Sequence, residues 1–385
     1  MLIGIDAHWL EGNRTGVGRY LFNLLKAWSR SESDILSRAP EHGRVCQVKF
    51  VLYFKDEIPK DLPQSSLFKV MLLNVKSTAK FIHWDLCRAA CKDKVDVLFC
   101  PAYIAPLFYS GKIALTLHDI IYETHPEWFE WKSWADKILL KWVSKISARK
   151  AALIFTISDF SRQEIIEYFR IKAEKIKAIP LAGDIGEVAE GGSDEILKNQ
   201  FGIKDRFGFY VGSIFNRRHL SEIIDAFSRI AQERSDFQLL LAGKDHTKPA
   251  QDIRGKAEKV NKKLERHAIL RVDFVNDHEL KLLYNACAFF IYLSDYEGFG
   301  LPPLEAMALG APTITSDATS LKEVAGSAAL LVKENSDTEE IYQAMKKIID
   351  EEALRSRLIE KGKEQAAKFS WKKCAEETLS ELLNA

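Results

Sequence analysis

The sequence has no long apolar segment, no excess of charge of one sign and no paired cysteine motif. No uninterrupted apolar run reaches the roughly 18 residues that a membrane-spanning helix needs. The 55 lysines and arginines nearly balance the 54 aspartates and glutamates, which argues against a general nucleic-acid-binding protein. The six cysteines show no CxxC spacing, so we expect neither a zinc site nor a disulfide framework.

A recognisable targeting segment is also missing. The chain begins directly with the strand-like LIGIDA, which leaves no room for a signal peptide, so we expect a cytoplasmic protein. Its 385 residues are too many for one ordinary domain and favour two. The 47% of apolar and 28% of charged residues are typical of a globular protein.

The N-terminal part lacks a complete dinucleotide-binding glycine motif. Gly16 and Gly18 come about ten residues after the strand expected at 2–7, and Leu21 stands where a third glycine would be needed. A hydride-transferring dehydrogenase is therefore disfavoured. We expect both glycines to precede an amphipathic helix whose N-terminus can bind an anion, with a plain helix start as the alternative.

Apolar, β-rich segments alternate with helical ones along most of the chain. This alternation predicts an α/β protein with two Rossmann-like, doubly wound parallel sheets, in which ligands bind beyond the carboxyl ends of the strands. The expected strands are 2–7, 48–54, 68–73, 95–102, 112–119 and 153–158, then 209–213, 237–242, 270–274, 288–294 and 312–316. A Gly-rich, acidic linker is expected at 182–193.

The most informative segment is 297–310, EGFGLPPLEAMALG. Gly298 and Gly300 allow a tight turn whose amides can approach a ligand. Pro303 fits the first position of a helix, and a helix N-terminus attracts anions. Glu297 precedes the turn, and Glu305 is expected in the first helical turn. Amides and carboxylates in this arrangement suit a ligand with phosphates and sugar hydroxyls, although Glu305 could also only complement the helix dipole.

This segment closely resembles the signature of retaining glycosyltransferases of family 4, and the resemblance extends along nearly the whole chain. The family has the GT-B fold, in which two Rossmann-like domains face a central cleft. The resemblance implies an acceptor-side domain at 1–182, joined by the final helix 369–385, and a domain at 183–368 that binds the nucleotide sugar.

The resemblance also assigns roles. Glu297 would bind hydroxyls of the donor sugar near the reacting carbon, and Glu305 would accept hydrogen bonds from the ribose. His118 follows the strand expected at 112–119, and the family histidine there lies beside the transferred sugar, so His118 would act across the closed cleft. A satisfied core histidine is the alternative. Asp119 would orient His118 or cap the next segment, and Arg19 would lie on the acceptor side.

A basic loop supplies the expected anion partner. Arg217 and Arg218 precede a helix expected near 219–220, and an arginine fork can pair with a diphosphate. The family usually has Pro-Arg-Lys-Asn here, its lysine aligning with Arg218 and its asparagine with His219. Loop arginines that are merely solvated are the alternative. The further donor-binding candidates that the resemblance suggests are Gly16, Gly18, Ser213, Lys244, Val275, Gly298, Phe299, Gly300 and Leu301.

These assignments imply a metal-independent, retaining hexosyltransferase. The donor would be a nucleotide-diphosphate sugar, GDP-mannose first and a UDP sugar second, and no other cofactor is expected. The acceptor would be a glycan or a lipid-linked molecule. We identify no carboxylate nucleophile, so a same-face route is favoured. A non-catalytic nucleotide-sugar-binding protein should lack Glu297, His118 or the basic loop, and all three are present.

Residues 128–150 combine tryptophan with lysine. Trp134, Ile138, Trp142 and Ile146 have the spacing of one helix face, with lysines on the intervening faces. This pattern is typical of a helix at a membrane interface, which would place the protein at the inner face of the membrane. A helix packed on its own domain with a solvated basic face is the alternative, and the sequence leaves both open. Trp128 and Trp131 belong to the same segment.

Overall fold

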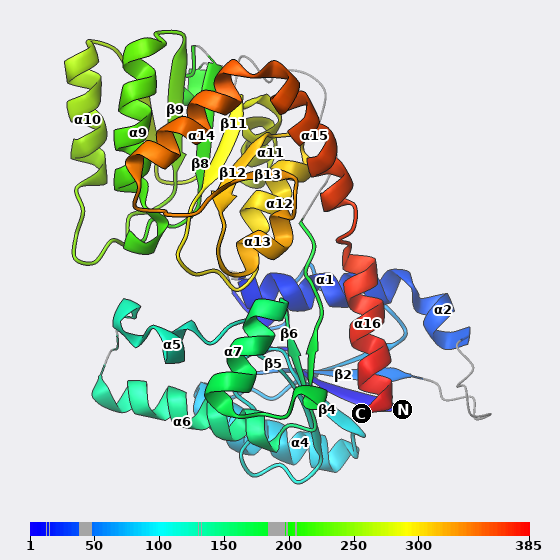
Figure 1. The fold of residues 1–385 in the computed structure, drawn as a ribbon. Helices are drawn as coiled ribbons and strands as arrows, with labels where there is room; N and C mark the ends of the chain where they lie inside the picture. The colour runs from blue at the N-terminus through cyan, green and yellow to red at the C-terminus, as the bar shows by residue number, and fades with distance from the viewer. Residues whose placement is uncertain are drawn as a thin grey trace. The chain divides into compact units, whose positions relative to one another are not determined.

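The computed structural model describes all residues except 13, 15, 38–47, 130, 132, 184–196, 198 and 205, and it leaves the side chains of 135 and 136 undescribed. The described chain divides into two compact units, Met1–Leu181 with Ser370–Ala385, and Ala182–Phe369. Each unit is a parallel sheet with helices packed around it (Figure 1). The predicted α/β class with two Rossmann-like sheets is confirmed. Most of the expected linker lies outside the described residues.

The first unit contains a seven-stranded sheet in the order β3-β2-β1-β4-β5-β6-β7 among the described residues. Every neighbouring pair is parallel. The strands are β1 (Leu2–Asp6), β2 (Lys49–Phe54), β3 (Phe68–Leu72), β4 (Val97–Cys100), β5 (Lys112–Thr116), β6 (Leu153–Thr156) and β7 (Ile176–Ala178).

The last helix of the chain belongs to the first unit. It packs against α1 (Figure 1). The indole nitrogen of Trp28 on α1 donates a hydrogen bond to the carbonyl of Ala375 at 2.9 Å. The helices of this unit are α1 (Gly16–Arg30), α2 (Glu32–Ser37), α3 (Thr78–Lys80), α4 (Leu86–Asp93), α5 (Ile121–Thr124), α6 (Trp134–Lys150), α7 (Asp159–Phe169) and α16 (Trp371–Asn384). Single turns are η1 (His8–Leu10), η2 (Phe81–Asp85), η3 (Pro126–Trp128) and η4 (Ala173–Lys175).

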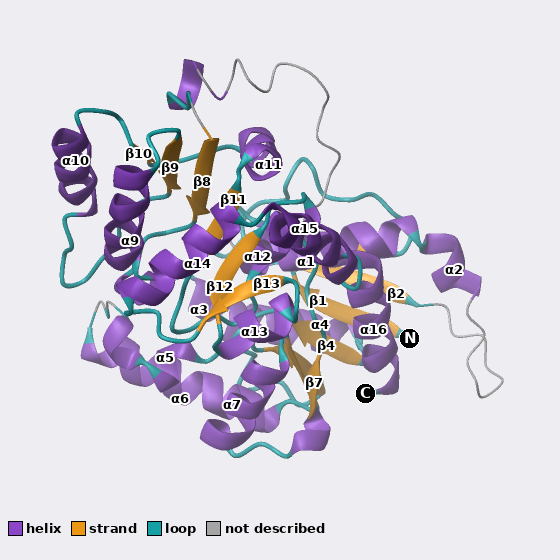
Figure 2. Cartoon of the chain, turned by 45° about the horizontal axis from the view of Figure 1, so that its top comes forward, coloured by secondary structure: helices purple, strands orange, loops and turns teal. Residues whose placement is uncertain are grey.

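The second unit contains a six-stranded parallel sheet in the order β10-β9-β8-β11-β12-β13, counted over the residues that are described. Its strands are β8 (Arg206–Val211), β9 (Phe237–Ala242), β10 (Ile269–Val272), β11 (Phe289–Tyr292), β12 (Thr313–Ser316) and β13 (Ala329–Val332). Its helices are α9 (Leu220–Glu233), α10 (Ile253–Leu264), α11 (Asp277–Ala286), α12 (Leu301–Ala308), α13 (Thr319–Ala325), α14 (Thr338–Asp350) and α15 (Glu352–Ala366), with the turn η5 (Asn216–Arg218). Figure 2 shows strands and helices in separate colours.

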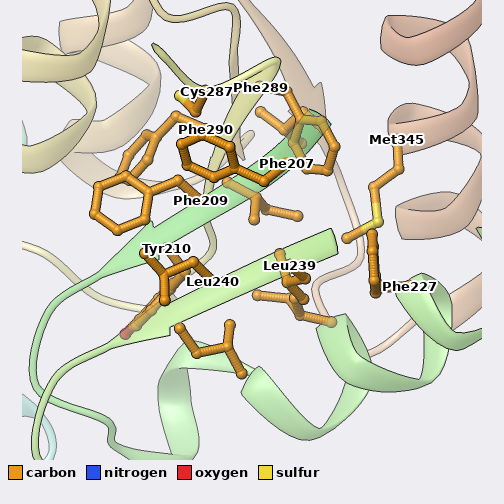
Figure 3. Close-up of a cluster of buried hydrophobic side chains, with 14 of the residues drawn as sticks. Phe207, Phe209, Tyr210, Phe227, Leu239, Leu240, Cys287, Phe289, Phe290 and Met345 are labelled. Carbon is orange, nitrogen blue, oxygen red and sulfur yellow. The ribbon is translucent and has the colours of Figure 1, made fainter. Parts of the chain in front are cut away.

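Aromatic and aliphatic side chains of β8, β9 and β11 form the core of this unit, together with residues of α9 and α14 (Figure 3). Close packing fixes some positions. A Cβ built on Gly208 of β8 would lie 2.2 Å from the ring of Phe289 on the neighbouring strand, so only glycine fits there. The core holds the central strands rigidly, and their carboxyl ends therefore present the following loops in fixed positions.

Several expected boundaries are wrong by one to three residues. The strand expected at 112–119 ends at Thr116, so His118 and Asp119 lie in the loop that follows it. Gly16 and Gly18 do not precede α1 but lie in its first turn. Helix α12 begins at Leu301, so Pro303 is its third residue. The strands β7 and β13 were not predicted, because runs of three or four half-buried residues carry little periodic signal.

No helix within the described ranges is long and apolar enough to cross a bilayer. The five cysteines that the structure describes are all free thiols, and Cys46 lies outside the described residues. Of these five, Cys100, Cys287 and Cys374 are buried.

Candidate active site

The second unit has a reversal of strand order between β8 and β11. From β8 the chain continues to β9 on one side of the sheet, while β11 adds on the other side. Ligands of open parallel sheets bind beyond the carboxyl ends of the strands at such a reversal. The loop 212–219 follows β8, and the loop 293–300 follows β11. These are the two segments that contain Arg218 and Glu297.

Arg218 and Glu297 form an ion pair at this point. The Nε and Nη2 atoms of Arg218 donate to Oε1 of Glu297 at 3.2 and 3.0 Å. Nη1 of Arg218 donates to the carbonyl of Ser213 at 2.6 Å. The two charged side chains are only 10% and 16% exposed, so their attraction is weakly screened by water. The basic loop and the glutamate, 79 positions apart in the sequence, therefore meet in the folded unit.

Two tyrosines complete the surroundings of the ion pair. The Tyr292 hydroxyl donates to Oε1 of Glu297 at 3.1 Å, and the guanidinium carbon of Arg218 lies 4.9 Å from the centre of its ring. Tyr210 stacks on Tyr292 at 5.8 Å. Burial acts to lower the pKa of Arg218, but the charge of Glu297 and the nearby tyrosine hydroxyls outweigh it and raise that pKa overall. Arg218 is therefore a permanent cation, held in place before any ligand arrives.

A cavity of about 250 Å³ opens beside this pair. It includes Ser213, Lys244 and Val275, three of the predicted donor-binding residues. The backbone of Gly212 and Gly243 forms part of its wall, and both have a positive φ, of +142° and +140°. A Cβ on Gly243 would lie 1.9 Å from the carbonyl oxygen of Gly212, so the two loops can approach this closely only with glycine at position 243. The full lining is Val211, Gly212, Ser213, Ala242, Gly243, Lys244, His246, Asp273, Phe274 and Val275.

The glycine turn before α12 has two different parts. Gly300 has φ +111°, and a Cβ there would lie 2.7 Å from Leu321, so this position requires glycine. Gly298 is buried, and Leu301 is the first residue of α12. Phe299 is only 5% exposed, and its ring contacts that of Phe369 at 5.8 Å. Its side chain is therefore a packing element, which leaves backbone amides as the part of this turn that a ligand can use.

Glu305 lies in the second turn of α12, because the helix begins at Leu301. It is half-buried, and the Tyr284 hydroxyl donates to its Oε2 at 3.5 Å. The expectation of a first-turn position is thus wrong. The idea that Glu305 only complements the helix dipole is wrong with it, because that effect is confined to the first turn.

Arg217 directly precedes Arg218 in the chain, and its guanidinium carbon is 4.3 Å from the centre of the Phe215 ring.

His118, in the first unit, is buried and neutral. Its Nε2 bonds to the carbonyl of Pro101 at 3.1 Å, which makes Nε2 the donor and leaves Nδ1 as an acceptor. Burial lowers the pKa of His118 to about 4, against a smaller opposing effect of that hydrogen bond. Asp119 accepts from the backbone N–H of Ile121 at 3.3 Å, so it caps the following turn. At neutral pH His118 can therefore accept a hydrogen bond from a sugar hydroxyl and cannot act as an acid.

The start of α1 is shaped by packing. A Cβ on Gly18 would lie 2.5 Å from the carbonyl oxygen of Trp9, so this glycine lets η1 approach the helix. Gly16 has open space around it, and Arg19 is exposed. The ligand contacts predicted for these three residues stay predictions.

Two polar clusters escaped the sequence analysis. Asp6, at the end of β1, accepts from Nδ1 of His8 at 2.5 Å, and the pair is almost fully buried. His219 bonds through Nε2 to Oδ1 of Asp295 at 2.7 Å, beside the Arg218–Glu297 pair. The position of Asp6 at the carboxyl end of a central strand could have indicated the first pair. The second joins residues 76 apart, and no local pattern could have indicated it.

The tryptophans of 128–150 divide between two environments. The Trp131 indole donates to the carbonyl of Pro126 at 3.0 Å, and its ring packs on the core of the first unit. On α6, by contrast, Trp134 is 77%, Ile138 47%, Leu139 59% and Trp142 60% exposed. The buried face of α6 is formed by Val143, Ser144, Ser147 and Ala148. The expected stripe thus faces solvent for three of its four members, and Ile146 is half-buried.

Among the described residues, no group of three or more His, Cys, Asp or Glu side chains is placed to hold a metal ion. The Arg218 guanidinium is a fixed cation at the reversal between β8 and β11.

Comparison with known proteins agrees with this geometry. Residues 193–365 match the family "Glycosyl transferases group 1", and residues 14–186 match "Glycosyltransferase Family 4". The chain is similar to the O-antigen chain mannosyltransferase B of Escherichia coli, 30% identical over 72% of this chain and 73% of that protein. It is 34% identical to the serotype-specific mannosyltransferase WbdA of E. coli over 58% of this chain, but spans only 27% of that longer protein.

Solved structures show the same fold. The structure of Anabaena Alr3699/HepE in complex with UDP and glucose superimposes with a TM-score of 0.71, covering 100% of this chain and 99% of that chain, at 17% identity. The likeness shows the GT-B fold. With the family matches over both units and the mannosyltransferase relative, it establishes that this chain belongs to the group 1, or family 4, glycosyltransferases and is a glycosyl-transferring enzyme.

Proposed function

We propose that this enzyme transfers a mannosyl unit from GDP-mannose to a glycan or lipid-linked acceptor, with retention of configuration and without a metal ion. The observation that carries the proposal is the preformed Arg218–Glu297 pair, which joins the loops after β8 and β11, next to a cavity of about 250 Å³ that is lined by the carboxyl ends of β8 and β9 and the segment after β10. A fixed cation there suits a diphosphate, and a carboxylate suits sugar hydroxyls. The mannosyl assignment is supported by two relatives that are O-antigen chain mannosyltransferases.

The proposed chemistry assigns one role to each group. As the bond between the sugar C1 and the phosphate oxygen breaks, its electron pair passes to the diphosphate, whose charge Arg218 and the amides of 298–300 stabilise. The acceptor hydroxyl attacks C1 from the same face and passes its proton to the leaving phosphate. Glu297 binds sugar hydroxyls and stabilises positive charge at C1, and Glu305 accepts from the ribose. Lys244, Ser213 and Val275 line the space for the base and the phosphates.

The donor assignment is tested by thermal unfolding in the presence of GDP, UDP, dTDP and ADP, each with and without EDTA. A nucleotide present at about 100 times its Kd adds about 2.7 kcal/mol to the free energy of unfolding, which raises Tm by several degrees. We expect the largest shift with GDP, unchanged by EDTA. A shift with UDP alone would favour the second candidate, a UDP-sugar donor, which the UDP-bound structural neighbour supports. Loss of the shift in EDTA would contradict metal independence.

We further propose that α6 docks on an anionic membrane surface, which would bring the enzyme to a lipid-linked acceptor. The exposed Trp134, Ile138, Leu139 and Trp142 form one apolar face. The C-terminal end of the helix adds exposed Arg149 and Lys150. Tryptophan and basic residues on one amphipathic helix are what binding at an interface requires. Among the relatives, a Campylobacter jejuni enzyme that acts on a diphospho-undecaprenol substrate supports a lipid-linked acceptor.

The double change Trp134→Ser and Trp142→Ser is expected to weaken binding to vesicles that contain phosphatidylglycerol by at least about tenfold, because two large apolar side chains no longer insert. Co-sedimentation measures the binding, and the hydrolysis of free donor should be unchanged. Trp84→Ser is the matched control, since Trp84 is 63% exposed but lies on η2. Equal sedimentation of the double variant and wild type would contradict membrane docking through α6.

A further inference from the structure

The loops that carry Arg218 and Glu297 are joined by more than their ion pair. The backbone N–H of Asp295 donates to the carbonyl of Arg217 at 2.9 Å. Nε2 of His219 bonds to Oδ1 of Asp295 at 2.7 Å. His219 directly follows Arg218, and Asp295 is two residues before Glu297. The His219–Asp295 hydrogen bond is therefore a second link between the two loops that the Arg218–Glu297 ion pair joins.

The second link is anchored on both sides. His219 has φ +51°, in the left-handed region that few residues other than glycine and asparagine adopt, and it ends the turn η5 immediately before α9. On the other side, Nδ2 of Asn335 donates to the same Oδ1 of Asp295 at 3.0 Å. Ser316 in turn donates to Asn335 at 2.7 Å. A strained backbone persists only where surrounding contacts hold it, and the Asp295 carboxylate is the contact here.

The charges around His219 favour its protonated form. Burial acts to lower the pKa of His219, but the hydrogen bond and charge of Asp295, with the charges of Glu222 and Glu334, raise it overall. Glu222 lies on α9, 3.9 Å from Nδ1, and Glu334 follows β13. The cations beside it in the chain are Arg217 and Arg218. Because the pKa is raised in the folded protein, the extra stabilisation is present at low pH and is lost as the pH rises through that pKa.

We propose that His219 is a positioning residue: through Asp295 it holds the loop of Glu297 against the turn of Arg218 and keeps the guanidinium set for a diphosphate. The proposal rests on the proposed function in one respect, that the anion bound by Arg218 is a nucleotide diphosphate. The protonated imidazole makes a charge-assisted bond to Asp295, about twice as strong as that of the neutral ring, which can still donate from Nε2. Diphosphate binding should therefore weaken, without being abolished, above the pKa of His219.

The test uses His219→Asn, which tolerates the left-handed backbone but has neither the charge nor the reach of the imidazole. The Kd for GDP is measured by calorimetry at about pH 6 and about pH 9, on either side of the usual range of histidine pKa values. At the lower pH we expect the Kd of the variant to be about five times that of wild type, because the variant lacks one charge-assisted hydrogen bond. At the higher pH, where the imidazole is neutral, the two Kd values should differ by less than about twofold. The exposed His278 of α11 provides the control His278→Asn, which should match wild type at both pH values.

Asp295→Ala removes the acceptor of the same link from the other side and keeps the inference testable if His219→Asn does not fold. This variant should show the same increase in the Kd for GDP at the lower pH. The Kd of the double variant should not exceed that of the single variant with the higher Kd, because both changes remove the same bond. Equal GDP affinity of variants and wild type at both pH values, with only a lowered Tm, would overturn the positioning role. If wild type binds UDP and not GDP, the donor assignment fails, and the same ratios measured with UDP decide on His219.

Discussion

Replacing Arg218 by alanine is expected to lower kcat about a hundredfold or more, with GDP-mannose as donor and the release of GDP as the measurement. Arg218 is the cation fixed at the reversal between β8 and β11, and the loss of one donor to a developing anion typically costs a factor of about 10² to 10³. The change also removes the hydrogen bonds of Arg218 to the Glu297 carboxylate, which keeps the hydrogen bond from the Tyr292 hydroxyl. Arg218→Lys keeps the charge without the fork, so its kcat should be intermediate.

Arg229→Ala is the matched control for this change. Arg229 lies on α9 of the same unit, where it forms an exposed ion pair with Glu339. Surface pairs of this kind contribute little, so turnover should stay at the wild-type value. Turnover of Arg218→Ala within about threefold of wild type would mean that another group stabilises the diphosphate, and it would remove the proposed role of Arg218.

Glu297→Gln is expected to have the second largest effect, on both activity and folding. The amide keeps the size and an acceptor but loses the negative charge that would stabilise C1, so kcat should fall about a hundredfold. The change also leaves the Arg218 guanidinium, which is 10% exposed, without a counter-charge. Removing one partner of a buried ion pair costs on the order of 3 kcal/mol of unfolding free energy. Urea denaturation measures this loss, and the assay should be run well below the midpoint.

Glu339→Gln is the control for Glu297→Gln. It also removes one negative charge, but from the exposed ion pair with Arg229, so it shows how much of the loss in unfolding free energy comes from burial of the Arg218–Glu297 pair. Its urea midpoint should match that of wild type. If Glu297→Gln kept the wild-type midpoint as well, the buried pair would contribute nothing to folding. If it kept wild-type turnover, Glu297 would have no part in the reaction.

The architecture could be predicted from the sequence because most of the central strands are short runs rich in apolar residues. Boundaries failed where strands leave the sheet early. Residues such as Leu117 and His118 still look apolar or strand-like in the sequence, yet they lie beyond the last paired residue, Thr116. The start of α12 was misplaced for a different reason. Two prolines in its first three positions hide where the helix begins, and because it begins at Leu301, Glu305 lies in the second turn.

The site was predictable to the extent that its residues fall in one local segment. Glu297, the two glycines after it and Glu305 stand within nine residues, whereas the ion pair of Arg218 with Glu297 joins residues 79 apart and was not predicted. The link His219–Asp295 depends on which loops the fold brings together, whereas His8–Asp6 is a local pair two residues apart at the end of β1. The exposure of Trp134 also could not be predicted from the sequence, because apolar residues at helical spacing can form either a buried face or a solvent-exposed face of a helix.

The contact between Gly212 and Gly243 limits how this enzyme can change. A methyl group on Gly243 would collide with the Gly212 backbone, and one on Gly212 would lie 2.7 Å from Nη1 of Arg218, so this part of the cavity wall is closed to substitution. Variation in donor preference, whether in natural relatives or in a designed library, must therefore come from the rim. Exposed Lys244 and Phe274 are the positions at which a library should begin.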